Sequence, residues 1–306
     1  MKRVSLHLAA GIVLSLLVAT SGSAQVARVF LAGTGNDAGD CSNQATPCRS
    51  LQGAVAQCPV DGEIIILDNG GYGGANITKS LTVNASAGVV AFIARTITVS
   101  IGATDKVVLR GLSMNGVVFG DPNGIAFNEG GTLVVENSVI AGFGTGIDQN
   151  VAGSNLIVNN CEIRSNVNGV RNNTDSDTNS NTVIENSRFE YNRFYGVIVE
   201  RGTANVSIRN SVVAHNFAGV FAYSKSQLRP VVIVVDTCTL AHNTVGTEAD
   251  TVTAGSATIR VTNSTINHND NGMLFDGLGA ATESYGNNRV TANTTNSTFS
   301  GAVLLQ

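Results

Sequence analysis

The feature that most constrains the fold is a six-residue motif that recurs along the chain at intervals of 23 to 27 residues. The copies are VENSVI from Val135, VNNCEI from Val158, IENSRF from Ile184, IRNSVV from Ile208, VDTCTL from Val235 and VTNSTI from Val261, with a fainter copy, LRGLSM, from Leu109. The first and last positions stay apolar while the second and fifth vary. This pattern predicts that two positions face a core and two face solvent.

A second constant segment follows each motif in the same register. It places asparagines in one column and glycines in another, namely Asn166, Asn192, Asn216, Asn243 and Asn269, and Gly169, Gly196, Gly219, Gly246 and Gly272. Another short apolar strand follows each glycine. We therefore interpret each repeat as short strands separated by Asn or Gly corners, since these residues tolerate left-handed backbone angles.

A period of this length, built only from strands and corners, predicts a parallel β-solenoid in which one repeat forms one coil. Strands of successive coils would then pair about 4.8 Å apart. An inward corner asparagine could bond to the asparagines above and below it in a buried ladder. The motif predicts this ladder at Asn137, Asn160, Asn186, Asn210 and Asn263, with Thr237 as the single break.

These repeats resemble those of right-handed parallel β-helix proteins of the pectin-lyase-like superfamily, and the chain is similar to an uncharacterised secreted bacterial member. The resemblance spans nearly all of residues 28–300. It implies an all-β, single-stranded right-handed parallel β-helix with a short N-terminal capping α-helix. It says little about chemistry, because one fold hosts many activities. The Gly-His-Gly signature of polygalacturonase-like hydrolases is missing, and the calcium and arginine sites of pectate lyases do not map onto this chain residue by residue.

The sequence predicts three segments along the chain. Residues 1–24 have a basic start at Lys2 and Arg3, an apolar run and a small residue at Ala24, which is typical of a cleavable signal peptide. Residues 25–60 would form the N-terminal segment with the capping helix, and residues 61–306 the β-helix. We expect a protein that is secreted, periplasmic or on the cell surface, with no transmembrane segment after cleavage.

The capping helix is expected to start at Thr46 and Pro47, because proline suits the first turn of a helix. Further along, four apolar residues recur at helical spacing and would cover the open end of the core. They are Leu51, Ala54, Val55 and Cys58.

The five cysteines permit a disulfide in an oxidising compartment. We expect Cys41 to pair with Cys48, while the pairing of Cys58 stays open because it could compete for either partner. Cys161 and Cys238 share a column three coils apart, which is too far for a bond.

Every histidine after the N-terminal segment occupies one place in the repeat, directly before a corner asparagine. His215, His242 and His268 would therefore stack in three consecutive coils. Two interpretations stay open. The column is either a ladder of corner residues with local hydrogen bonds, or a zinc, copper or nickel site. A linear ladder is poor geometry for one ion, whose ligands must converge on it.

Acidic residues form a second column, four places after the corner glycines. Glu200, Asp250 and Asp276 are the candidate catalytic carboxylates, with Arg201 beside them. The spacing of coils would put these carboxylates about 5 and 9.5 Å apart, near the separations used by glycosidases. Exposed rings and a cation would bind substrate next to them, namely Tyr223, Phe221 and Lys225. Charge columns on solenoid faces also serve solubility alone.

The segment DSDTNSN places Asp175 and Asp177 in an alternating pattern that resembles the first half of a calcium loop. Ser180 stands where such a loop has glycine, and no glutamate occupies the twelfth place. A polar insertion loop is the competing interpretation. Calcium is therefore a possible cofactor, and no cofactor is certain.

The sequence predicts a secreted β-helix that binds or processes an extracellular polysaccharide on a solvent-facing strip, as a lyase or hydrolase if it is catalytic. The alternative is a non-catalytic surface adhesin or structural spacer. Nucleic acid is excluded as a partner by the net charge of −4. We expect a monomer.

Overall fold

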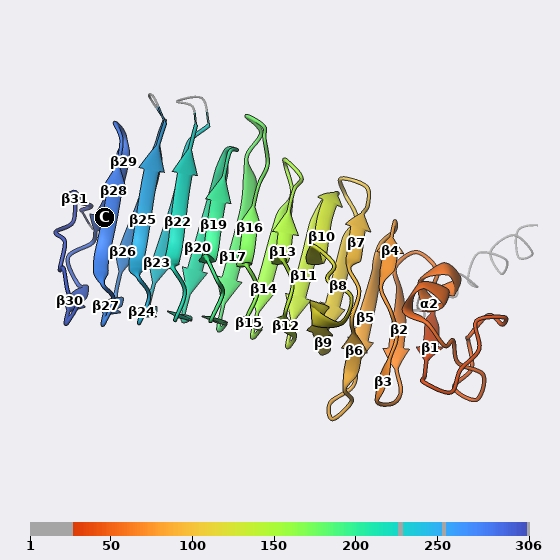
Figure 1. Cartoon of the computed structure of the whole chain (residues 1–306). Helices are drawn as coiled ribbons and strands as arrows, with labels where there is room; N and C mark the ends of the chain where they lie inside the picture. Colours follow the sequence, from red (N-terminus) through yellow and green to blue (C-terminus); the bar gives the residue numbers. More distant parts are fainter. Residues whose placement is uncertain (1–26, 226–228, 253–254, 305–306) are drawn as a thin grey trace, which may run out of the picture.

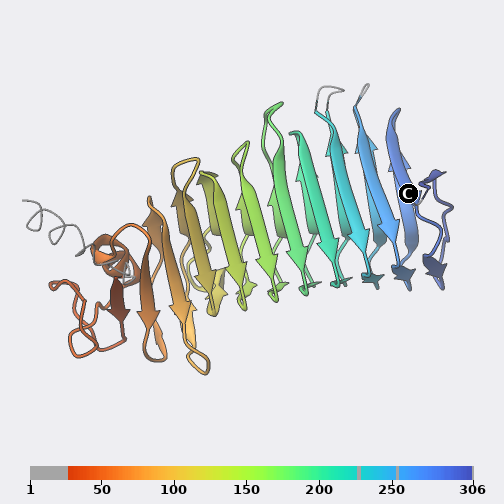
Figure 2. The same ribbon diagram turned by 180° about the vertical axis from the view of Figure 1, so that it is seen from behind.

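The protein is a parallel β-solenoid, as seen in a computed structural model that describes residues 27–225, 229–252 and 255–304. Figures 1 and 2 show the coils stacked into one rod, with the single α-helix of the described residues at the N-terminal end. The proposed signal peptide, residues 1–24, lies outside the described residues. The right-handed parallel β-helix with a short N-terminal helix is thus confirmed.

Each coil contributes strands to three parallel sheets, which we call sheets A, B and C, with their strands counted over the described ranges. Sheet A has 12 strands: β1 (Arg28–Leu31), β2 (Gly62–Ile66), β5 (Leu81–Ala85), β8 (Lys106–Arg110), β11 (Thr132–Glu136), β14 (Asn155–Asn159), β17 (Ser180–Glu185), β20 (Ala204–Arg209), β23 (Val231–Asp236), β26 (Ala257–Thr262), β29 (Ala280–Ser284) and β31 (Gly301–Ala302). Sheet B has 10 strands: β3 (Gly70–Gly71), β6 (Ala91–Ile93), β9 (Leu112–Asn115), β12 (Val139–Ala141), β15 (Glu162–Arg164), β18 (Arg188–Glu190), β21 (Val212–Ala214), β24 (Thr239–Ala241), β27 (Thr265–Asn267) and β30 (Arg289–Thr291). Sheet C has 9 strands: β4 (Ala75–Ile77), β7 (Ile97–Ser100), β10 (Asn123–Glu129), β13 (Thr145–Gln149), β16 (Asn168–Asn172), β19 (Tyr195–Glu200), β22 (Ala218–Ser224), β25 (Val245–Thr251) and β28 (Asn271–Asp276).

The strand register confirms that the motifs stack on one another. Val135 pairs with Val158, and the same position continues through Ile184, Ile208 and Val235 to Val261 in successive strands of sheet A. Side chains alternate between the core and solvent along each strand. One column of apolar residues therefore lines the interior from coil to coil.

A ladder of buried asparagines runs along the interior, but it is not the one that we predicted. The asparagine directly after the histidine column is buried in each coil, and its amide nitrogen donates to the amide oxygen of the next, from Asn166 through Asn192, Asn216, Asn243 and Asn269 to Asn293. These bonds satisfy buried amides that would otherwise be costly.

The predicted column, Asn137 to Asn263, faces solvent instead. Its residues have left-handed φ angles, such as 51° at Asn137, and this turn of the backbone points the side chain outward. Some of these amides do bond along the axis, as Asn160 does to Asn137 at 2.7 Å. Asn210 also donates to Asn186, whereas Asn186 donates to Asn159 and Asn263 to Asp236. The prediction of an axial ladder was therefore right in part, and the prediction of burial was wrong.

The corner glycines owe their place to close packing rather than to left-handed angles. None of the four from Gly169 to Gly246 has a positive φ. A Cβ atom at Gly196 would lie 2.6 Å from the carbonyl oxygen of Gly219 in the next coil. The column is therefore glycine because adjacent coils approach too closely for a side chain.

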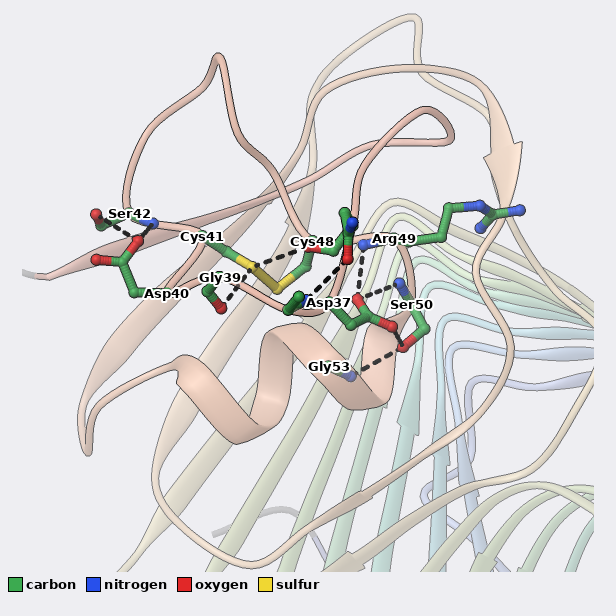
Figure 3. Close-up of a disulfide and its surroundings, with 11 residues drawn as sticks. Asp37, Gly39, Asp40, Cys41, Ser42, Cys48, Arg49, Ser50 and Gly53 are labelled. Atoms are coloured by element: carbon green, nitrogen blue, oxygen red, sulfur yellow. Dashed lines mark hydrogen bonds between the residues drawn. A yellow bond between two sulfur atoms is a disulfide. The ribbon is translucent and has the colours of Figure 1, made fainter.

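The capping helix α2 spans Leu51–Gln57. It therefore starts later in the chain than Thr46, where the sequence predicted its start. The residues before it are held extended, since the Cys48 N–H donates to the Phe30 carbonyl and the Ala32 N–H donates to the Cys48 carbonyl. Ser50 is the N-cap, and its hydroxyl accepts from the Gly53 N–H at 3.0 Å (Figure 3). The predicted apolar face is buried as expected.

Replacing Ser50 with alanine is expected to lower the free energy of unfolding by about 1 kcal/mol, because the cap bond to Gly53 is lost. The Ser50 hydroxyl also donates to Asp37 at 2.7 Å, so the loop before the helix would loosen as well. Urea denaturation measures the change. An unaltered midpoint would contradict the role of this cap.

Cys41 and Cys48 form the predicted disulfide, with their Cα atoms 5.2 Å apart (Figure 3). Cys58, Cys161 and Cys238 are free and buried, and burial raises the pKa of each thiol to about 11. A thiol with a raised pKa holds little thiolate at neutral pH and is a weak nucleophile. The three free cysteines are therefore packing residues.

Candidate active site

The outward face of sheet C carries a hollow of about 540 Å³ between β16 and β25. Its lining combines aromatic rings, an amide and two carboxylates, including Asn168, Tyr195, Glu200, Phe221, Tyr223 and Asp250. A concave surface that joins apolar rings to a few polar groups is typical of a ligand site.

The acidic column that we predicted is formed by the strand register. Glu200 on β19 lies beside Tyr223 on β22, which lies beside Asp250 on β25 and then Asp276 on β28. Glu200 and Asp250 line the hollow, whereas Asp276 lies outside it on the last strand of the sheet. The Asp276 carboxylate accepts from the N–H of Gly277 at 2.8 Å. The structure thus brings two of the three predicted carboxylates to the hollow.

Three rings stack across the floor of the hollow. Tyr195 lies 4.9 Å from Phe221, and Phe221 lies 5.9 Å from Tyr223, between ring centres. Phe221 is only 8% exposed, so the prediction of an exposed stacking platform there was wrong. The neighbouring tyrosines cover it, and the aromatic surface available to a ligand is that of Tyr195, Tyr223 and Phe194, which is 42% exposed.

Glu248 lies next to the lining of the hollow without being part of it, and our sequence analysis did not name it as a candidate site residue. It lies on β25 between Phe221 and Leu274 of the adjacent strands, two places before Asp250. One carboxyl oxygen, Oε2, is buried and has no hydrogen-bond partner. Burial raises the pKa of Glu248, and the charge of Asp250 raises it further. The apolar residues that neighbour it in the same column, Ile198, Phe221 and Leu274, were the signal that could have revealed it.

The pKa of Tyr195 shows that three acidic side chains lie near its hydroxyl. Burial raises the pKa of its hydroxyl, and the charges of Glu248, Glu200 and Asp250 each add to the rise. Three carboxyl groups from β19 and β25 therefore act on one phenol. Such a grouping, with one acid in an apolar setting, favours a division of roles between proton donor and charged carboxylate.

The cations around the hollow already have partners. Arg171 holds Asp148 through two hydrogen bonds of 3.0 Å, and this bonding raises the pKa of Arg171. The Nε atom of Arg201 lies 3.6 Å from the carboxylate of Glu200. Lys225 lies over the ring of Tyr223, 5.5 Å from its centre. Arg201 and Lys225 thus contact lining residues of the hollow without being part of its lining.

The histidine column is an exposed stack of parallel rings. The centres of His215 and His242 are 5.0 Å apart and those of His242 and His268 are 5.2 Å apart, while Tyr191 continues the stack. Parallel rings do not point their nitrogens at one ion. Among the described residues, no group of three or more His, Cys, Asp or Glu side chains could hold a metal. The geometry matches the ladder of corner residues.

The segment that resembled a calcium loop is an insertion loop tied down by one arginine. Asp175 and Asp177 both pair with Arg229, and the Asp177 contact is 2.8 Å. Asn179 and Asn181 bond to each other and to asparagines on neighbouring coils. The carboxylates that calcium would need are engaged in ion pairs.

Comparison with known families identifies the fold. A family model described as "Right handed beta helix region" matches residues 64–245. The chain belongs to this family. The match includes Glu200 and Tyr223, and it ends at Val245, before Glu248 and Asp250 on β25.

Solved structures also resemble this β-helix protein. The structure of pectate lyase Pel9A superposes with a TM-score of 0.65 at 16% identity, covering 91% of this chain and 78% of that one. The A-module of mannuronan C-5 epimerase AlgE4 from Azotobacter vinelandii superposes more loosely, with a TM-score of 0.44 at 11% identity and coverages of 80% and 91%. A comparison with curated proteins gives no match.

These similarities concern the fold alone, because the identities are low. The structural neighbours named above are polysaccharide-processing proteins by their names. Within the described residues, no helix of this β-helix protein is long and apolar enough to cross a membrane.

Proposed function

We propose that this β-helix protein binds a polysaccharide in the hollow on sheet C and hydrolyses its glycosidic bonds there. The observation that carries the proposal is Glu248, an acid with a buried, unpartnered oxygen and a raised pKa next to Asp250. Glycoside hydrolysis uses two acids of unequal character, one kept protonated and one ionised. The aromatic rings beside them suit the apolar faces of sugars.

In the proposed reaction, Glu248 donates its proton to the glycosidic oxygen as the bond from that oxygen to the anomeric carbon breaks. Asp250 takes a proton from a water molecule, whose oxygen forms the new bond to the same carbon. The two residues lie two places apart on one face of β25, so their backbones are about 6.6 Å apart. The carboxyl groups of inverting glycosidases lie about 6.5 to 9.5 Å apart, and the torsion angles of the two side chains would have to set this separation.

Glu200 has a binding role in this proposal. It lies two strands from Asp250, about 9.6 Å across the sheet. Its carboxylate, held by Arg201, would accept hydrogen bonds from sugar hydroxyls, and Tyr195 and Tyr223 would stack on the rings. We also propose that residues 1–24 direct export, which would place the protein where extracellular polysaccharides are found.

Replacing Asp250 with asparagine is expected to lower cleavage at least about 100-fold, since the base is lost. Asp276→Asn is the matched control, because Asp276 follows Asp250 in the same column but lies outside the hollow. Its activity should stay close to that of the unaltered protein. Release of reducing sugar from a panel of neutral and acidic glycans measures hydrolysis, and absorbance of unsaturated products measures elimination.

Three outcomes would contradict this proposal. Unsaturated products would make the enzyme a lyase. Equal loss in both variants would remove Asp250 from its role. Binding without any product would make the protein an adhesin, the alternative raised by its sequence.

A further inference from the structure

We infer that the polysaccharide taken by this hollow is uncharged. The inference rests on the proposed function and names its substrate class. Among the described residues, the lining of the hollow contains the carboxylates of Glu200 and Asp250 and no lysine, arginine or histidine. The pectate lyase and the mannuronan epimerases of similar fold have names that refer to acidic polymers. The lining of this hollow is unlike what an acidic polymer needs.

The cations near the hollow do not provide a place for the carboxylates of a substrate. Arg171 makes both of its 3.0 Å hydrogen bonds to Asp148, and together the two carry no net charge. Arg201 is committed to Glu200 and lies at the rim. Lys225 and Arg193 lie over the rings of Tyr223 and Phe194 and are not part of the lining. A polyuronate bound in the hollow would therefore bring carboxylates toward the two acids of the lining, with the cations confined to its edge. A substrate carboxylate next to Glu200 or Asp250 would be repelled, and the repulsion is stronger where water is partly excluded.

An uncharged glycan satisfies the same groups. Carboxylates only accept hydrogen bonds, and sugar hydroxyls supply the donors that Glu200 and Asp250 lack. The exposed faces of Tyr195 and Tyr223 offer apolar area to the C–H faces of sugars, and the amide of Asn168 adds a group that can donate and accept. Uncharged glycans also lack the carboxylate that makes elimination easy, which agrees with hydrolysis.

Affinity measurements with the mature protein test this inference. The probes are length-matched oligosaccharides of xylan, β-glucan, galactan and mannan, and oligogalacturonate and oligomannuronate, each with calcium and with chelator. We expect the best neutral probe to bind at least tenfold more tightly than either uronate under both conditions. Tyr223→Ala should weaken that binding about tenfold, since one aromatic contact contributes on the order of a tenfold change.

A charge variant tests the reason for the selectivity. Removing both acids of the hollow in Glu200→Gln, Asp250→Asn is expected to raise the affinity for oligogalacturonate several-fold. Asp236→Asn is the control, because Asp236 lies on sheet A, away from the hollow. Added salt should raise uronate binding to the unaltered protein, since salt screens repulsion.

The results separate the inference from the function on which it rests. Tighter binding of a uronate that Tyr223→Ala abolishes would overturn the inference and leave the hollow as the binding site. Glycan binding that Tyr223→Ala does not change would overturn both, because the ligand would then bind elsewhere. Absence of binding to every probe would do the same.

Discussion

Replacing Glu248 with glutamine is expected to lower glycan cleavage by about 100- to 10,000-fold while binding persists. Glutamine keeps the shape of the side chain and cannot donate the proton that the leaving oxygen needs. The initial rate on the best neutral glycan and the affinity for an oligosaccharide of that glycan measure the two effects. Glu185→Gln on sheet A is the control, since Glu185 faces solvent far from sheet C.

The pH dependence of glycan cleavage should reflect the protonation of Glu248. Because the pKa of Glu248 is raised by burial and by Asp250, the carboxyl stays protonated to a higher pH than an ordinary glutamate does. Cleavage should fall as pH rises through this pKa. A profile whose upper limb is the same in the unaltered protein and in residual activity of Glu248→Gln would contradict the assignment.

The substitution Glu248→Gln should raise stability at alkaline pH, although it lowers activity. The folded protein holds the Glu248 proton more tightly than the unfolded chain does, so unfolding releases a proton at pH values between the ordinary glutamate pKa of 4.5 and the raised pKa. Stability therefore falls as pH rises through this window. Glu248→Gln removes the buried charge and should raise the melting temperature by about 2 °C at pH 8 and leave it unchanged at pH 4. Equal melting curves at pH 8 would contradict a buried, strained carboxyl.

The repeat spacing was enough to predict the fold, because one period sets one coil and the coil sets the neighbours of every strand. The column of Glu200, Tyr223, Asp250 and Asp276 followed from counting residues after each corner glycine. In a solenoid, each repeat adds one coil, so the number of repeats between two residues gives their separation along the axis. Register could therefore be predicted here, as it could not for a fold with long-range crossings.

Side-chain direction at the corners could not be predicted by counting. Both Asn137 and Asn166 follow a strand, yet one has a left-handed backbone angle and faces out while the other faces in. The burial of Phe221 depends on how two tyrosines on neighbouring coils lean over it. The pairing of Asp175 with Arg229 joins loops that are separated by an intervening coil. Each of these depends on torsion angles that the spacing does not specify.

The raised pKa of Glu248 could not be predicted from the sequence for the same reason. Counting two residues after each corner glycine places Glu248 in one outward column with Arg171 and Leu274. Its raised pKa comes from the apolar neighbours on adjacent strands and from Asp250 on its own strand. A sequence shows an acid, and only the packing of three coils raises its pKa.

The largest effect on stability is expected at the middle of the interior asparagine ladder. The Asn216 oxygen accepts from the backbone and side-chain N–H groups of Asn192, at 3.0 and 3.1 Å. Its amide nitrogen donates to Asn243, at 3.1 Å, and to two backbone carbonyls. Asn216→Ala would leave several buried polar groups without partners, each at a cost of about 1 to 3 kcal/mol. We expect a loss of about 4 kcal/mol in the free energy of unfolding.

The outer column supplies the matched control for this prediction. Asn210→Gly removes an exposed amide at a left-handed position, where φ is 47° and glycine is tolerated. It should change stability by less than about 0.5 kcal/mol. Urea denaturation of both variants compares an inward with an outward asparagine six residues apart in one coil. Similar losses in the two would mean that stacking of the strands, rather than satisfaction of buried amides, holds adjacent coils together.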